Sequence, residues 1–171
     1  MRIGVPKEIK PQENRIGLTP ESVKVLTSNG HEVLVESNGG YEAGFDNEQY
    51  KKSGAKIANK AEDIFNDSEI IVKVKEPLNN EIKMIKENQI VFTYLHLAAA
   101  RELTEGLVKS KSVCIAYETV TDNNGRLPLL APMSAVAGRM SIQAGAHSLE
   151  KNQKGRGISV SYTHLTLPTK A

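Results

Sequence analysis

Short apolar runs rich in β-branched residues alternate with helical segments along this chain of 171 residues, and this alternation limits the folds open to it. The run at 70–74 is nearly continuous rather than alternating in polarity, which is typical of a strand buried on both faces of a parallel sheet. Strands are predicted at Arg2–Val5, His31–Glu36, Lys56–Ala58, Ser68–Val74, Gln89–Tyr94 and Ser112–Tyr117. Helices are predicted from Pro20 up to Gly30 and at Asp46–Ser53, Lys60–Asn66, Asn79–Lys86, Ala98–Lys109 and Met133–Leu149. The predicted fold is therefore α/β, a Rossmann-like (flavodoxin-like) parallel sheet with helices on both faces.

The last predicted helix differs from the others because small residues recur along it. Such residues allow another element to approach closely, so we interpret Met133–Leu149 as a C-terminal connector helix between domains. We expect a substrate domain at 1–131, followed at 132–157 by the connector helix and the start of a second domain. Residues 158–171 are threonine-rich and without helical period, and they are predicted to form an atypical tail.

Composition and charge exclude several classes of function. The net charge is +2, and lysines are interspersed with glutamates rather than gathered in a basic patch, so no nucleic-acid or membrane binding is predicted. The single cysteine, Cys114, excludes a disulfide framework within the chain. No apolar stretch approaches the roughly 20 residues of a membrane span. Because Met1–Lys7 also lacks the apolar region of a signal peptide, the expected compartment is the cytoplasm.

Three chemically capable residues each follow a predicted strand: Arg15, Lys75 and His96. Ligands of open parallel sheets bind beyond the carboxyl ends of the strands, so all three are expected at the edge where a site forms. An arginine holds a carboxylate with a planar fork, a lysine polarises a carbonyl oxygen, and a histidine transfers protons near neutral pH. Together these residues suit a small keto acid or amino acid.

Each candidate also has an ordinary structural explanation. Arg15 and Lys75 are compatible with a solvated loop and an exposed strand end, and a histidine between two leucines is often a core residue. Lys73 is predicted to lie inside its strand and to be structural. No pair of histidines or carboxylates has the spacing of metal ligands, so no metal site is predicted.

Several segments in order resemble alanine dehydrogenase, of the alanine dehydrogenase and NAD(P) transhydrogenase α-subunit family. They are Met1–Lys10, Glu13–Pro20, Lys73–Pro77, Tyr94–Ala98 and Ala131–Ser141, and the resemblance covers about residues 1–157. It implies an NAD-dependent enzyme that interconverts L-alanine with pyruvate and ammonium. It also implies that the full-length protein is a homo-oligomer, a hexamer.

The resemblance gives each candidate residue a role. It implies that Arg15 binds the substrate carboxylate, that Lys75 contacts the substrate carbonyl or amino position, and that His96 is the catalytic acid and base. Ser134 corresponds to a position that approaches the NAD cofactor. Three further residues correspond to neighbours of the pocket: Tyr94, Leu130 and Met133.

The dinucleotide fingerprint and the catalytic aspartate of the family have no counterpart in this sequence. The nearest glycine-rich segment, Gly155-Arg156-Gly157, lacks a third glycine, a preceding strand and a following helix. We therefore expect this chain to be inactive alone, and we interpret 158–171 as foreign or misread sequence joined to a truncated gene. Two alternatives stay open: a transhydrogenase α-subunit-like domain, and a non-catalytic module that binds small acids.

Overall fold

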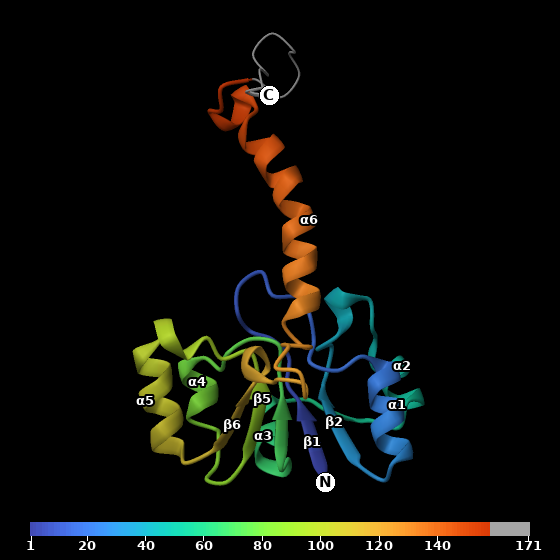
Figure 1. Ribbon diagram of the computed structural model, residues 1–171. Coiled ribbons are helices and arrows are strands. Elements are labelled where there is room, and N and C mark those ends of the chain that lie inside the picture. Colours follow the sequence, from blue (N-terminus) through green and yellow to red (C-terminus); the bar gives the residue numbers. More distant parts are fainter. Residues whose placement is uncertain (158–171) are drawn as a thin grey trace. The chain divides into compact units, whose positions relative to one another are not determined.

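The computed structural model describes residues 1–157, which divide into a first unit, Met1–Thr121, and a second unit that begins at Asp122. The first unit contains six strands: β1 (Arg2–Val5), β2 (Glu32–Glu36), β3 (Lys56–Ala58), β4 (Ile70–Val72), β5 (Ile90–Thr93) and β6 (Val113–Ala116). All pair in parallel, in the order β3-β2-β1-β4-β5-β6 (Figure 1). This is the strand order of the Rossmann fold, and the order reverses between β1 and β4. The predicted α/β class with a parallel sheet is confirmed.

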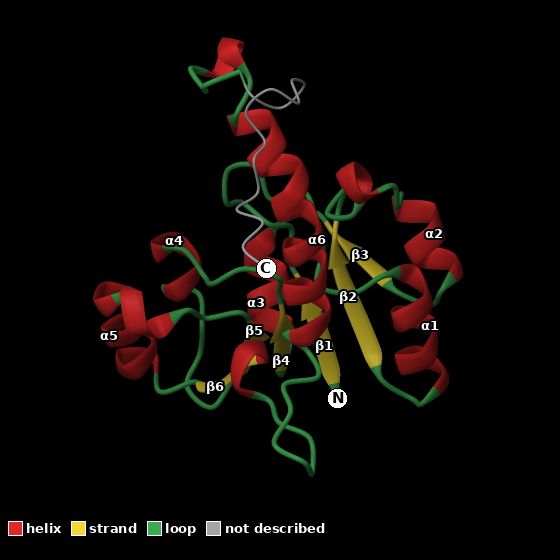
Figure 2. Ribbon diagram, turned by 45° about the horizontal axis from the view of Figure 1, so that its top comes forward, coloured by secondary structure: helices red, strands yellow, loops and turns green. Residues whose placement is uncertain are grey.

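Helices connect successive strands, as the colours of Figure 2 make visible. Those of the first unit are α1 (Pro20–Ser28), α2 (Asn47–Lys52), α3 (Ala61–Asp67), α4 (Asn79–Ile82) and α5 (Arg101–Ser110), and the second unit contains α6 (Ala131–Ser148). Residues 1–157 also contain four short 3-10 turns. No helix was predicted at η1 (Tyr41–Ala43), η3 (Tyr117–Thr119) or η4 (Lys151–Gln153), whereas η2 (Leu97–Ala99) overlaps the start of the helix predicted at Ala98–Lys109. The predicted C-terminal helix is confirmed as α6. The predicted tail at 158–171 lies outside the described residues.

Local sequence signals explain where the first two helices begin. The side chain of Thr19 accepts a hydrogen bond from the backbone N–H of Ser22 at 3.3 Å, and Pro20 occupies the first position of α1. Asp46 caps α2 in a reciprocal pair with Gln49, with distances of 2.8 Å and 2.7 Å. These side chains satisfy backbone donors that have no partner within the helix.

Among the elements that are shorter than predicted, β4 and α4 end early for physical reasons that the structure shows. The strand expected at Ser68–Val74 ends at Val72, because the N–H of Val74 donates to the Glu8 carboxylate at 2.6 Å. The helix expected at Asn79–Lys86 ends at Ile82, because the following backbone turns more tightly. The N–H of Met84 bonds to the carbonyl three residues earlier, at 2.9 Å, instead of four.

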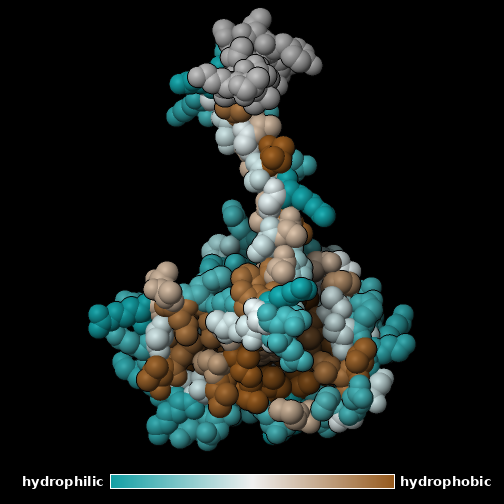
Figure 3. Space-filling view, viewed as in Figure 1, coloured by the Kyte–Doolittle hydropathy of each residue, from teal (hydrophilic) through white to brown (hydrophobic). Residues whose placement is uncertain are grey.

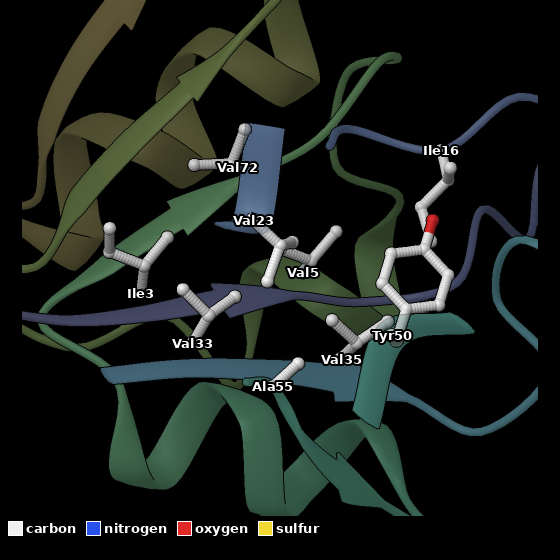
Figure 4. Packing of buried hydrophobic residues seen from close by; sticks show 9 residues of the cluster. All are labelled: Ile3, Val5, Ile16, Val23, Val33, Val35, Tyr50, Ala55 and Val72. Carbon is white, nitrogen blue, oxygen red and sulfur yellow. The ribbon is translucent and has the colours of Figure 1, made fainter. Parts of the chain in front are cut away.

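The hydrophobic core consists of two clusters on opposite faces of the sheet, since neighbouring residues of a strand point to opposite sides. One cluster joins β1, β2 and the end of β4 to α1 and α2; it contains Ile3, Val5, Ile16, Val23, Val33, Val35, Tyr50, Ala55 and Val72 (Figure 4). The other joins β4 and β5 to α3 and α5; it contains Ile64, Phe65, Ile71, Ile85, Val91, Leu95, Leu103 and Leu107. Helices therefore cover both faces, as predicted.

Some apolar side chains of the first unit are left exposed. Val113 and Ile115 on the edge strand β6 are 48% and 40% exposed. Figure 3 shows a band of apolar side chains across the middle of the visible face of the first unit. In the second unit, α6 buries none of its residues. No helix within residues 1–157 is both long and apolar enough to cross a membrane.

Candidate functional site

The three candidate residues lie at the carboxyl edge of the parallel sheet. Arg15 belongs to the loop between β1 and α1, Lys75 comes three residues after β4, and His96 comes three residues after β5. The loops that carry Arg15 and Lys75 follow β1 and β4, the two strands between which the strand order reverses. Ligands of open α/β sheets bind at this switch point.

The Arg15 loop lies directly against the end of β4. A Cβ atom at Gly17 would come within 2.6 Å of the Val72 carbonyl oxygen and 3.2 Å of the Lys73 nitrogen, so only glycine permits this approach. The buried side chain of Ile16 and a 2.9 Å hydrogen bond from the Tyr50 hydroxyl to the Leu18 carbonyl anchor the loop on either side. Arg15 is therefore held close to the segment that contains Lys75.

A carboxylate occupies the guanidinium fork of Arg15. Nε of Arg15 donates to Oε1 of Glu13 at 2.8 Å, Nη2 donates to Oε2 at 2.5 Å, and the Arg15 backbone N–H donates to Oε1 at 3.0 Å. The hydrogen bond from Arg15 lowers the pKa of Glu13 to about 2, and the charge of Lys75 contributes in the same direction. The fork thus faces a carboxylate with the bidentate geometry in which arginine binds such groups most strongly.

The backbone of Lys75 is held by a second glutamate. Oε1 of Glu8 accepts from the N–H of Val74 at 2.6 Å and from that of Lys75 at 3.3 Å, while Oε2 accepts from Nζ of Lys73 at 3.1 Å. Lys73 also pairs with Glu81 at 2.7 Å. Lys73 lies just beyond the end of β4 rather than inside the strand, and it is fully buried within this ion cluster.

His96 follows β5 in a left-handed backbone conformation, with φ 51° and ψ 39°. Such a conformation is uncommon for a residue with a side chain and needs support from its surroundings. Glu118 provides that support, because Oε1 accepts from the N–H of His96 at 2.7 Å and from that of Leu95 at 3.1 Å. Burial raises the pKa of Glu118, but these donors outweigh burial and leave the pKa below its usual value. The Tyr94 ring stacks on the imidazole with centroids 6.0 Å apart.

Electrostatic interactions link the three loops. Glu13 raises the pKa of Arg15, with smaller contributions from Glu8 and Tyr94, and Tyr94 in turn contacts His96. A cavity of about 230 Å³ beside Arg15 is lined by residues 7–10 and 12–15 together with Gly39 and Glu42. The lining does not include Lys75 or His96. A wider depression between α4 and α5 contains Glu76 but none of the three candidates.

The remaining predicted site residues have different surroundings. Tyr94 is buried in the first unit, whereas Leu130, Met133 and Ser134 belong to the second. The Ser134 hydroxyl donates to the Leu130 carbonyl at 3.4 Å. Among residues 1–157, no group of three or more histidine, cysteine or acidic side chains is arranged to hold a metal ion.

Comparison with known protein families identifies the family of this chain. The family described as "Alanine dehydrogenase/PNT, N-terminal domain" matches residues 4–137, a range that contains Arg15, Lys75 and His96. The chain belongs to this family.

Relatives within the alanine dehydrogenase/PNT family include curated alanine dehydrogenases of Halomonas elongata and Staphylococcus epidermidis, 51% and 52% identical to this chain over 158 residues. The matches cover 92% of this chain but only 43% and 42% of those proteins, so the chain spans about two fifths of their length. A solved L-alanine dehydrogenase superposes with a TM-score of 0.85 at 53% identity, covering 92% of this chain and 43% of that one. A solved transhydrogenase from Sinorhizobium meliloti superposes with a TM-score of 0.65 at 27% identity. That match covers 69% of this chain and 35% of the transhydrogenase chain.

Two glutamates that hold the candidate loops, Glu8 and Glu118, were not among the site residues predicted from the sequence. Glu8 comes three residues after β1, and Glu118 comes two residues after β6. The rule that selected Arg15, Lys75 and His96, a chemically capable side chain in the segment after a predicted strand, also selects both of these residues. From sequence alone they could not be distinguished from the many glutamates that lie on solvated surfaces.

Proposed function

We propose that this chain supplies the substrate-binding part of an NAD-dependent L-alanine dehydrogenase, which deaminates L-alanine oxidatively and reversibly to pyruvate and ammonium. The observation that carries the proposal is the arginine fork of Arg15, which holds a carboxylate bidentately beside the Lys75 segment. L-Alanine and pyruvate both carry a carboxylate beside the reacting carbon. Identities of about 50% to proteins named alanine dehydrogenase support this choice of substrate.

Each residue has a distinct task in this proposal. The substrate carboxylate displaces Glu13 from the fork of Arg15 and fixes the orientation of the small molecule. The ammonium group of Lys75 donates a hydrogen bond to the oxygen on the carbon next to the carboxylate and stabilises negative charge there. His96 gives and takes the protons that accompany addition of water and departure of ammonia.

The loop after β1 does not fit the phosphates of NAD. In a Rossmann fold, glycines after the first strand let the dinucleotide phosphates approach the backbone. Here the loop after β1 carries Pro6, Lys7 and Glu8, and Glu8 is a buried carboxylate. We therefore assign NAD binding to the remainder of the full-length protein, with Ser134 approaching the cofactor. The chain alone is proposed to be inactive, and the full-length enzyme to be a cytoplasmic hexamer.

Two other functions receive less support. A transhydrogenase α-subunit-like role has a structural relative, but identity to that relative is 27% against 53% for the L-alanine dehydrogenase. A module that only binds small acids would use the same arginine, and nothing on the sheet edge favours it over the enzyme.

Calorimetric titration with pyruvate tests the proposed binding site. We expect the chain to bind pyruvate and Arg15→Ala to bind about tenfold or more weakly, because a hydrogen-bonded charge pair is worth roughly 1.5–3 kcal/mol. Arg2→Ala is the matched control, since Arg2 is exposed at the start of β1, at the opposite edge of the sheet from the site. Equal binding by wild type and Arg15→Ala would contradict the role of Arg15. Alanine-dependent NADH formation by the chain alone would contradict its proposed inactivity.

A further inference from the structure

A buried ion cluster lies beneath the candidate site and is not used in the proposed chemistry. Nζ of Lys73 is 2.7 Å from Oε1 of Glu81 and 3.1 Å from Oε2 of Glu8. The side chains are 0%, 3% and 2% exposed respectively. They come from three segments: the loop after β1, the end of β4 and the helix α4.

Such a cluster is a poor means of gaining stability. Removing charges from water costs several kcal/mol for each ion, and well-packed apolar side chains often serve at least as well. The arrangement therefore calls for an explanation other than stability. The carboxylate oxygens that do not bind Lys73 suggest such an explanation. They accept hydrogen bonds from backbone N–H groups of the segment that contains Lys75.

The two glutamates hold opposite ends of this segment. Oε1 of Glu8 accepts from the N–H groups of Val74 and Lys75, whereas Oε2 of Glu81 accepts from the N–H of Leu78 at 2.8 Å. Their other oxygens share the ammonium group of Lys73. Residues 74–78 are thereby fixed between two carboxylates that are themselves fixed by one buried cation.

We propose that Glu8 is a positioning residue for Lys75. It sets the backbone from which the Lys75 ammonium reaches the substrate oxygen, and it does not contact the substrate itself. Glu81 shares Lys73 but touches neither the Val74 nor the Lys75 N–H. The inference rests on the substrate role proposed for Lys75, and a comparison of Glu8 with Glu81 separates positioning from general stability.

The test measures pyruvate affinity, amide hydrogen exchange at Val74 and Lys75, and melting temperature in Glu8→Ala, Glu8→Gln and Glu81→Ala. We expect Glu8→Ala to bind pyruvate about tenfold more weakly and to exchange both amides faster, because their acceptor is gone. Glu8→Gln retains an acceptor oxygen and should recover much of the affinity and of the protection. Glu81→Ala should melt at a comparably lowered temperature while its affinity stays within about twofold of wild type.

Equal loss of affinity in Glu8→Ala and Glu81→Ala would overturn the inference, since general destabilisation would then explain both. Unchanged exchange at Val74 and Lys75 in Glu8→Ala would overturn it as well. If Glu8→Ala does not fold, Glu8→Leu and Glu81→Leu give the same comparison, because leucine fills a similar volume without an acceptor. Absence of pyruvate binding by the wild-type chain would count against the proposed function, and amide exchange would then decide the positioning role by itself.

Discussion

At the scale of single residues, a glutamate accepts a hydrogen bond from the backbone N–H of each candidate site residue. Glu13 binds the N–H of Arg15, Glu8 binds that of Lys75, and Glu118 binds that of His96. Hydrogen bonds to a charged acceptor are stronger than those between neutral groups. The backbone of the proposed site is therefore arranged before any ligand binds, while the Arg15 and His96 side chains stay exposed.

The pairing of Glu13 with Arg15 makes a prediction about pH. Arg15→Ala should return the pKa of Glu13 from about 2 toward its usual 4.5, as measured by NMR of the side-chain carboxyl carbon. Because the pKa is lowered in the folded state, the pair stabilises the protein above the unfolded pKa, and this contribution disappears as the pH falls toward 2. Wild type should thus exceed Arg15→Ala in stability near neutral pH but not in strong acid. A Glu13 pKa unaffected by the substitution would refute the assignment.

At the scale of elements, the sequence predicted the sheet and its helices well because the decisive signals are local. Thr19 and Pro20 define the start of α1 within a few residues, and Asp46 does the same for α2. The early end of β4 could not be predicted from the sequence, because it depends on Glu8, a residue 66 positions away from Val74. The periodicity of apolar residues within a short window does not indicate such a distant contact.

The positions of the candidate residues along the chain were predictable, but the contacts that hold them were not. The edge positions of Arg15, Lys75 and His96 follow from strand order alone. The left-handed backbone of His96 and its support by Glu118 do not, since a side chain that binds a distant loop leaves no pattern along the sequence. Neither sequence spacing nor strand order determines how close the three side chains come.

The approach of the Arg15 loop to β4 makes a prediction at the scale of elements. Gly17→Ala should lower the free energy of unfolding by about 1–3 kcal/mol, because the new methyl group meets backbone atoms that cannot move independently. It should also weaken pyruvate binding. Gly138→Ala is the control, since no atom lies within 4 Å of the added Cβ and alanine favours the helix. Denaturant unfolding of both variants measures the difference, and equal stability would show that the loop can shift at little cost.

At the scale of the whole molecule, the buried apolar side chains of residues 1–157 that form the core lie in one of the two units. Both core clusters lie within Met1–Thr121, whereas α6 in the second unit buries no residue. The exposed side chains of α6 include Val136, Met140 and Ile142. Apolar surface of this kind is typical of regions that contact another chain or domain.

This concentration predicts that a fragment of residues 1–121 folds independently. Its melting temperature should lie within about 4 °C of that of the 171-residue chain, because both core clusters lie within the fragment. Calorimetry of the two proteins at equal concentration checks this. A fragment that melts without cooperativity would contradict it.

The central place of β1 has a consequence for synthesis of the protein on the ribosome. β1 is made first and pairs early with β2, Arg2 lying beside Glu32, but its other neighbour is β4, where Ile3 lies beside Ile70. At roughly 5–20 residues per second, one edge of β1 stays unpaired for some seconds after β2 has emerged. An unpaired edge invites association with other strands. The period in which the nascent chain is most exposed to misassembly is thus set by the stretch of sequence between β2 and β4.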